Sequence, residues 1–460
     1  MMRYYKQTKF NILFSGLILA LFGMQSCQPV NENYPSEAAD PSFLHQTMKQ
    51  LTDVIVHDIF SPPIASRIYA YSSIAAYEVL QQDYPEYQSL AGQLNEFEGV
   101  PEADPAEEYS FPLAATKAFI TVGKALIFSE QMMDEHEAKM MEEFKATGMP
   151  NDVFRRSLAY GEEVGKAILA WSATDNYKET RTYPKYSIVE SDPARWQPTP
   201  PDYMDGIEPH WREIRTFVLE KPDQFKPKPP TPFDMTEGSP FYQEVMEVYN
   251  AVQEEADNQE ERIAIAEFWD CNPYVSHHVG HVMYATKKIT PGGHWINIVQ
   301  IACETAKADI MKSAEAYAMT SLALADGFIS CWDEKYRSNL IRPETVINEY
   351  IDESWAPTLQ TPPFPEYTSG HSVISRAAAT ALTSIFGNDF AFHDTSEEEF
   401  GLPSRTFDSF YQASEEAALS RLYGGIHYRP AIEVGVEQGQ KVGNYIVQQV
   451  KTRSQVSEVK

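Results

Sequence analysis

Three short patterns follow one another between residues 335 and 427: Lys335-x6-Arg342-Pro343, Ser369-Gly370-His371 and Ser420-Arg421-x5-His427. Together they supply three cationic side chains, two imidazoles, a hydroxyl and a glycine backbone N–H. Guanidinium and ammonium groups suit the oxygens of a compact tetrahedral oxyanion. One imidazole is then free to bond the central atom and the other to move a proton. The patterns therefore predict an oxyanion site assembled from distant parts of the chain.

The helices expected around these patterns explain how such a site forms. Residues 372–386 are rich in alanine, so Ser369-Gly370-His371 stands at a predicted helix N-terminus. Free backbone N–H groups and the positive end of the helix dipole attract anions there. Lys335 and Arg342 are seven residues apart, and an unbroken helix would place both on one face.

A glycine repeat after His427 predicts close helix packing. Gly435, Gly439 and Gly443 recur every four residues within the helical pattern of 431–450. Glycines on one helix face let a second backbone approach closely. We therefore expect this helix to fix the position of His427.

The order of the three patterns resembles the signature shared by vanadium-dependent haloperoxidases, type 2 phosphatidic acid phosphatases and bacterial acid phosphatases. The resemblance implies an all-α fold, a large helical-bundle domain. It makes His427 the ligand of vanadium in a bound vanadate, His371 the residue that moves a proton when hydrogen peroxide binds, and Lys335 the residue that polarises the peroxide. The oxyanion-binding positions that it implies are Lys335, Arg342, Ser369, Gly370 and Arg421.

Further segments resemble the haloperoxidase branch rather than the short phosphatases. They are Arg195-Trp196-Gln197-Pro198, Pro209-His210-Trp211, Phe268-Trp269-Asp270 and Thr290-Pro291-Gly292-Gly293-His294-Trp295. Glu344 follows Arg342-Pro343, where phosphatases often carry another base. Phe364, seven residues before His371, matches a position with Phe in chloroperoxidase-like and His in bromoperoxidase-like members. The resemblance thus makes Phe364 a candidate halide-site aromatic.

Our main hypothesis is a vanadate-dependent haloperoxidase that oxidises halide with hydrogen peroxide at a His427-bound vanadate. The alternative is a phosphatase, acting on a phosphomonoester or lipid phosphate through a phosphohistidine in the same pocket and without a cofactor. A third hypothesis is a helical surface lipoprotein that binds glycans without catalysis. Three convergent cations favour the two enzymes, because a sugar binder has no need of them.

The N-terminus predicts export. A basic start and an apolar run lead to Gln25-Ser26-Cys27, which resembles a bacterial lipoprotein cleavage site. We expect a signal peptide over residues 1–26, with Cys27 as the lipidated first mature residue. Residues 27–42 are predicted to be a flexible tether, and residues 43–455 a single helical domain. The expected location is the periplasm or an outer-membrane anchor, with membrane contact only through the lipid.

Composition narrows the partners. The formal net charge of −29 argues against nucleic acid and for small-molecule substrates held by a local group of cations. The chain has four cysteines and no Cys-x2-Cys pair, which disfavours a zinc site of that type. After Cys27, the cysteines Cys271, Cys303 and Cys331 allow one disulfide or none. The oligomeric state stays open.

Other segments carry simpler expectations. Helices are predicted over 43–59, 65–80 and 296–329, the last as one long run. The proline-rich residues 176–238 contain several aromatics, which favours an ordered loop over the cleft. His277-His278-x2-His281 could bind a metal if a helix put His277 and His281 on one face. The alternative is a polar segment at the mouth of the cleft.

Overall fold

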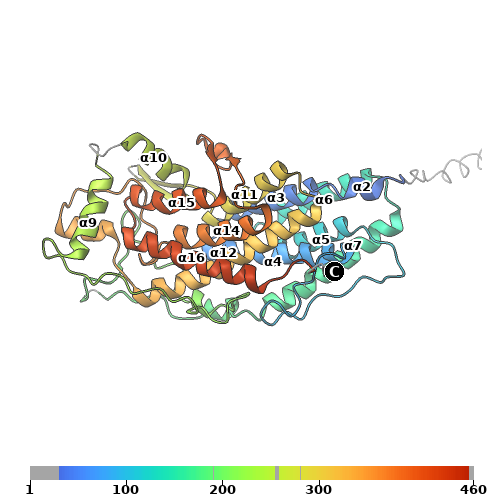
Figure 1. The fold of residues 1–460 in the computed structure, drawn as a ribbon, viewed down its shortest axis with the longest axis horizontal. Coiled ribbons are helices and arrows are strands. Elements are labelled where there is room, and N and C mark those ends of the chain that lie inside the picture. Colours follow the sequence, from blue (N-terminus) through green and yellow to red (C-terminus); the bar gives the residue numbers. More distant parts are fainter. Residues whose placement is uncertain (1–30, 190, 254–257, 280, 455–460) are drawn as a thin grey trace, which may run out of the picture.

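The computed structural model describes residues 31–189, 191–253, 258–279 and 281–454. The predicted signal peptide and Cys27 lie outside the described residues. The described chain is mostly helical, with two small two-stranded antiparallel sheets (Figure 1). The all-α prediction is confirmed.

The elements follow in chain order. The first part contains α2 Tyr34–Ala38, α3 Ser42–His57, α4 Pro62–Leu80, η1 Gln81–Asp83, α5 Phe111–Ala125, α6 Glu130–Ala146, α7 Asn151–Ser172, α8 Tyr177–Thr180 and η2 Trp211–Glu213. The middle contains α9 Pro240–Ala251, α10 Gln259–Phe268, β1 Val275–Val279, β2 Val282–Thr286, α11 Pro291–Ala306 and α12 Ile310–Ser338. The last part contains α13 Pro343–Tyr350, α14 Gly370–Phe386, β3 Phe392–Asp394, η3 Glu398–Phe400, β4 Arg405–Phe407, α15 Phe410–Tyr423 and α16 Arg429–Gln449.

Two groups of helices share α12 as their common wall. On one side α4 packs against α5 and α12, and α5 packs against α7; on the other, α14 packs against α12, α15 and α16. Figure 1 shows α12, α14 and α16 lying alongside one another. One hydrophobic cluster contains residues from both groups, among them Ile68, Phe119, Leu324 and Val373. The site patterns lie on α12, α14 and α15 and in the connections next to them.

The glycine repeat on α16 faces α14, as predicted. A Cβ on Gly439 would lie 2.2 Å from the Val373 carbonyl oxygen, and one on Gly435 would lie 2.8 Å from Ser372 Cβ. Real side chains do not tolerate such distances, so α16 packs backbone to backbone on the first turns of α14. This contact fixes His427, just before α16, relative to the Ser369-Gly370-His371 segment.

Two helix predictions are wrong, and left-handed residues explain both. Asn339 has φ 55° and ends α12, so Lys335 lies on α12 whereas Arg342 is the N-cap of α13. The two cations therefore do not share a helix face. The run predicted over 296–329 is two helices, because Lys307 has φ 51° at the end of α11 and Asp309 caps α12.

The predicted tether is shorter than expected. Residues 34–38 form α2, and α3 already begins at Ser42. Tyr34 and Ala38 are buried in a cluster with Phe144 and Phe154. This apolar packing holds the segment, which the polar composition of residues 28–42 did not indicate.

The proline-rich segment is ordered, as predicted. The buried carboxylate of Asp326 accepts the backbone N–H groups of Phe217, Val218 and Leu219 at 2.7–2.9 Å. Trp196 and Trp211 are 0% and 1% exposed, so the segment packs against the domain rather than linking two domains.

The histidine cluster is not helical. His277 and His278 lie on β1 and His281 lies in the following turn, so the helical face proposed for His277 and His281 does not exist. Cys271, Cys303 and Cys331 are buried free thiols, which answers the disulfide question for the described chain. Among the described residues, no helix combines the length and apolar character needed to cross a membrane.

Candidate active site

Two of the patterns line one pocket of about 280 Å³, through Gly370, His371, Arg421 and His427. The third pattern joins them behind the pocket wall, where Arg342 contacts His427. The other walls of the pocket are mainly apolar and aromatic: Ile59, Met204, Ile207, Tyr274, Phe328, Trp332 and Phe364. Lys335 and Arg342 are both 0% exposed. The spatial convergence predicted from the sequence is therefore present.

His427 is held in one orientation. Its Nδ1 lies 2.7 Å from Glu366 Oε1, which also accepts the Tyr428 N–H at 3.0 Å. Burial raises the pKa of Glu366 to about 8, although Arg342 and Lys335 oppose that rise. If Glu366 is protonated, the proton belongs on Oε2, which has no hydrogen-bond partner among the described residues. In both states Oε1 accepts from Nδ1–H, so Nε2 carries no proton and its lone pair acts as the acceptor.

The second ring nitrogen of His427 faces a cation. Its Nε2 lies 3.1 Å from Arg342 Nη1. Burial, together with the nearby charges of Arg342, Lys335 and Arg421, holds the pKa of His427 well below its ordinary value. The ring is therefore neutral near pH 7, and Nε2 can bond an electrophilic centre.

Two arginines carry N–H donors that no described residue accepts. Arg342 donates from Nε to the Phe364 carbonyl and from Nη1 to the Ile426 carbonyl, both at 2.8 Å, whereas its buried Nη2 has no partner. Arg421 donates from Nη1 to the Trp269 carbonyl at 2.6 Å, and its buried Nε has none. Buried donors without acceptors cost free energy that a bound oxyanion recovers. Arg342, Arg421 and His427 thus form an oxyanion cage, whose free donors fit vanadate or phosphate.

Lys335 lies against the backbone of residues 365–368, the segment that carries Glu366. Its Nζ donates to the carbonyl oxygens of Pro365, Glu366 and Thr368 at 3.0, 3.0 and 2.6 Å. These three bonds use all of its donors, so direct contact with an anion requires one of them to exchange. Burial lowers the pKa of Lys335 to about 7.

Ser369-Gly370-His371 forms the first turn of α14, as the sequence predicts. Ser369 is the N-cap, and its Oγ accepts the Ser372 N–H at 3.3 Å. Gly370 lines the pocket with its backbone next to Trp332. His371 Nε2 lies 3.4 Å from Arg421 Nη1, and burial and Arg421 lower the pKa of His371 well below its ordinary value. A neutral His371 at the pocket wall can accept a proton.

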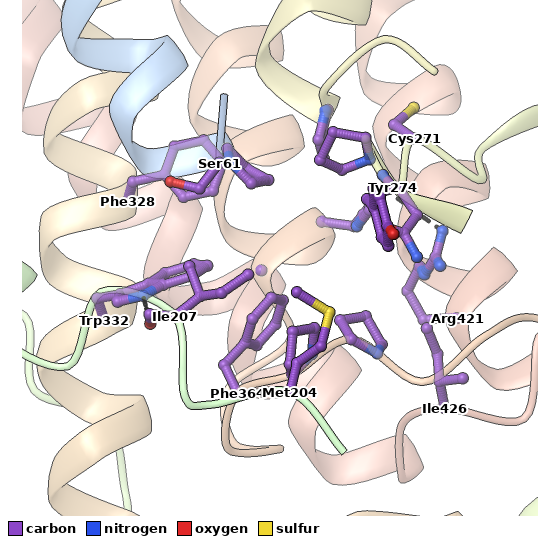
Figure 2. Close-up of a pocket in the computed structure, with 18 of the residues that line it drawn as sticks. Ser61, Met204, Ile207, Cys271, Tyr274, Phe328, Trp332, Phe364, Arg421 and Ile426 are labelled. Atoms are coloured by element: carbon purple, nitrogen blue, oxygen red, sulfur yellow. Dashed lines mark hydrogen bonds between the residues drawn. The ribbon is translucent and has the colours of Figure 1, made fainter. Parts of the chain in front are cut away.

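Phe364 connects the lysine and the first arginine. Its ring centroid lies 5.0 Å from both Lys335 Nζ and Arg342 Cζ, and 4.9 Å from the Trp332 ring. It also faces the pocket (Figure 2). The predicted halide-site aromatic is thus in contact with the cations of the site.

Sequence reasoning missed two supports of the site. Glu366 orients His427, and the only local hint was an acid among prolines and aromatics three residues before Ser369. The Trp269 carbonyl holds Arg421; its segment was noted only as part of the family resemblance. Such contacts have no sequence period and appear only when the fold brings the segments together.

A neutral histidine beside unpaired arginine donors, on a helical bundle with an apolar pocket, defines an enzyme that works at a bound oxyanion. Comparison with known proteins specifies the family. Residues 315–455 match the model of the VCPO second helical-bundle domain. The crystal structure of the first bacterial vanadium-dependent iodoperoxidase is similar with a TM-score of 0.86 and 50% identity, covering 93% of this chain and 99% of that chain. The chain therefore belongs to the vanadium-dependent haloperoxidase family and is an enzyme of that class.

Two more distant structures share the fold. An apo-type bacterial vanadium-dependent chloroperoxidase has a TM-score of 0.65 at 17% identity, covering 85% of this chain and 94% of that one. A holo-type bacterial vanadium-dependent chloroperoxidase has a TM-score of 0.64 at 18% identity, covering 92% and 96%. No curated protein matches the sequence.

Proposed function

We propose that this haloperoxidase uses hydrogen peroxide to oxidise iodide, with vanadate held on His427 Nε2. The observation that carries the cofactor assignment is the pair of unsatisfied donors, Arg342 Nη2 and Arg421 Nε, buried beside a neutral histidine. The phosphatase alternative uses the same cage, but the 50% identical relative is named an iodoperoxidase.

Each residue has a task in this reaction. When bound, vanadate supplies a Lewis-acidic centre that activates hydrogen peroxide towards attack by a halide. Arg342 and Arg421 neutralise its oxygens, and Lys335 adds charge from below. Glu366 keeps the His427 lone pair directed at the site. His371 accepts a proton when peroxide binds and returns it to the leaving oxygen, so that iodide, peroxide and one proton give hypoiodous acid and water.

The pocket walls support iodide as the preferred halide. Phe364, Trp332, Met204 and Ile207 present carbon and sulfur to the entering ion. Removing an anion from water costs less when the ion is large and weakly hydrated, and iodide is the largest and most readily oxidised of the common halides. An apolar wall therefore selects iodide over bromide and chloride.

Purified protein tests the proposal. After removal of bound oxyanion, the protein is assayed with and without vanadate, for peroxide-dependent iodide oxidation, dye bromination and phosphate release. We expect vanadate-dependent iodide oxidation with a kcat/KM at least about tenfold above that for bromide, since about 1.4 kcal/mol separates a tenfold preference. Phosphate release that vanadate inhibits, without halide oxidation, would establish the phosphatase instead.

We also propose that the protein is exported and anchored by a lipid on Cys27, with a folded domain that already includes α2. The basic start, the apolar run and Gln25-Ser26-Cys27 support this proposal. Labelling with a fatty acid in a bacterial host should mark the wild type and not Cys27→Ser. Equal labelling of both, or recovery of an unprocessed chain in the cytoplasm, contradicts the anchor.

A further inference from the structure

A second cluster of metal-ligand type lies beside the oxyanion cage. Cys271 follows α10, His294 lies in the first turn of α11, and Glu397 precedes η3. Their side chains are 1%, 0% and 1% exposed, respectively. Three segments far apart in sequence thus bring a thiol, an imidazole and a carboxylate together in the interior.

The three ligand atoms have the spacing of a coordination sphere. His294 Nδ1 lies 3.4 Å from Cys271 Sγ and 3.0 Å from Glu397 Oε1, and Sγ lies 4.0 Å from that oxygen. The point equidistant from all three lies about 2.1 Å from each, and Zn²⁺ binds N, O and S ligands at about 2.0–2.3 Å. A metal fits without rearrangement of the backbone.

The other nitrogen of His294 has the partner that metal-bound histidines usually have. Its Nε2 lies 2.9 Å from Asp394 Oδ2, and Asp394 Oδ1 accepts the Ser396 N–H at 3.0 Å. A carboxylate on the distal nitrogen fixes the ring and strengthens the donor atom that faces the metal. The His294 ring also stacks on Trp269 at 4.5 Å, which keeps Nδ1 pointing at Cys271 and Glu397.

We infer that Cys271, His294 and Glu397 bind one Zn²⁺, with water from the adjoining pocket as the fourth ligand. Cys271 is one of the residues that line that pocket, so the cluster lies directly beside a source of water. A mixed set of thiolate, imidazole and carboxylate is characteristic of zinc among the common divalent ions. This site is separate from the one that holds vanadate, and its existence does not depend on the halide proposed above.

The metal would also stabilise the catalytic cage. Trp269 stacks on His294 and its carbonyl holds Arg421. Zinc therefore ties α11 and the turn before η3 to the segment that positions this arginine. Its loss should loosen Arg421 without removing any group that contacts the oxyanion.

Metal analysis of the purified full-length protein tests the site. After chelation and reconstitution with zinc, plasma mass spectrometry should find one zinc per chain. Cobalt substitution should give a near-ultraviolet thiolate-to-cobalt band. Cys271→Ser should abolish that band and weaken zinc binding by at least about 100-fold. Cys303→Ser is the matched buried-thiol control, and His277→Ala tests the hairpin histidine.

The outcomes are distinct. Less than about a tenth of a zinc per chain after reconstitution, or no thiolate-to-cobalt band in the wild type, would show that His294 is only a hydrogen-bonded ion-pair partner. Zinc affinity unchanged in Cys271→Ser but lost in His277→Ala would also overturn the site. Because the cobalt spectrum is recorded on the wild type, the result stands even if Cys271→Ser fails to fold.

Discussion

His427 and His294 are two buried histidines that each contact a carboxylate through one ring nitrogen. They differ in the charge of the groups that face the other nitrogen. Each places one ring nitrogen within 2.9 Å of a carboxylate oxygen, Glu366 for His427 and Asp394 for His294. Beyond that, His427 faces Arg342, whereas His294 faces Glu397 and Cys271. Burial and then Arg342 lower the pKa of His427, whereas Asp394 and Cys271 raise that of His294 against the effect of its burial.

The difference shows that a histidine–carboxylate pair does not by itself define a role. The group that faces the remaining nitrogen decides whether the ring is a neutral donor to an electrophile or a site for a cation. The cage around His427 has unsatisfied N–H donors and awaits an anion. The cluster around His294 instead places two carboxylates, those of Asp394 and Glu397, against the ring, and they favour a positive charge there.

The largest loss of activity should come from removing the His427 imidazole, which we propose bonds the vanadate. We expect His427→Ala to lower vanadate-dependent halide oxidation by at least about a thousandfold, because the side chain bonds the reaction centre. Vanadium retention should fall in parallel, with little change in the circular dichroism spectrum. His136→Ala is a matched buried-histidine control and should retain activity. Full turnover by His427→Ala contradicts the role of this residue.

Removing the charge of Asp394, in the cluster around His294, should mainly lower the free energy of unfolding. Asp394→Asn leaves the buried His294 with a weaker partner, and loss of one member of a buried ion pair costs about 3 kcal/mol or more. We expect a clearly lower denaturant midpoint for this variant. A control at the exposed Asp389 should change the midpoint by less than about 0.5 kcal/mol. An unchanged midpoint in Asp394→Asn would mean that the pair is not formed.

The corresponding substitution of Glu366, the carboxylate beside His427, should mainly lower enzymatic activity. Glu366→Gln keeps the shape but weakens the group that orients His427, and such changes typically cost about 10–100-fold in affinity or activity. We expect lower vanadate affinity and kcat with little change in unfolding. If stability fell as in Asp394→Asn while activity remained, Glu366 would be structural, and the contrast between the two pairs would disappear.

The smallest effect concerns pH. With a pKa of about 7, Lys335 is charged below that pH and neutral above it. Affinity for sulfate, whose charge is constant in this range, should therefore decline above about pH 7, by at most about tenfold per pH unit. Titration calorimetry measures this, and Lys335→Arg should remove the decline near pH 7 and leave only the later one that deprotonation of Glu366 causes near pH 8. A flat profile in the wild type would show that its three carbonyl partners keep Lys335 charged.

Much of the site could be predicted because its cations and histidines stand in short ordered patterns. The start of α14 and the packing of Gly435 and Gly439 followed from local rules on helix termini and glycine. The shared helix face of Lys335 and Arg342 failed because one left-handed residue, Asn339, ends α12. Asparagine is, after glycine, the usual left-handed residue at a helix end, so this stop had a local signal that the seven-residue spacing of the two cations outweighed.

Glu366 and the His294 cluster were beyond sequence reasoning for a different reason. Their partners lie 23 to 126 residues away along the chain, so no local period relates them. The histidines that did stand close together, His277 and His281, drew attention instead. In the structure they belong to a hairpin.

The segment that carries Met204 and Ile207 into the pocket wall is attached to the domain mainly through its backbone. The Ile207 carbonyl accepts from Trp332 Nε1 at 3.2 Å and from the Tyr336 hydroxyl at 2.6 Å, and its N–H donates to the Pro363 carbonyl at 2.9 Å. Attachment of this kind does not depend on the side chains at Met204 and Ile207. Substitutions at Met204 and Ile207 should therefore change the shape of the pocket wall without detaching this segment.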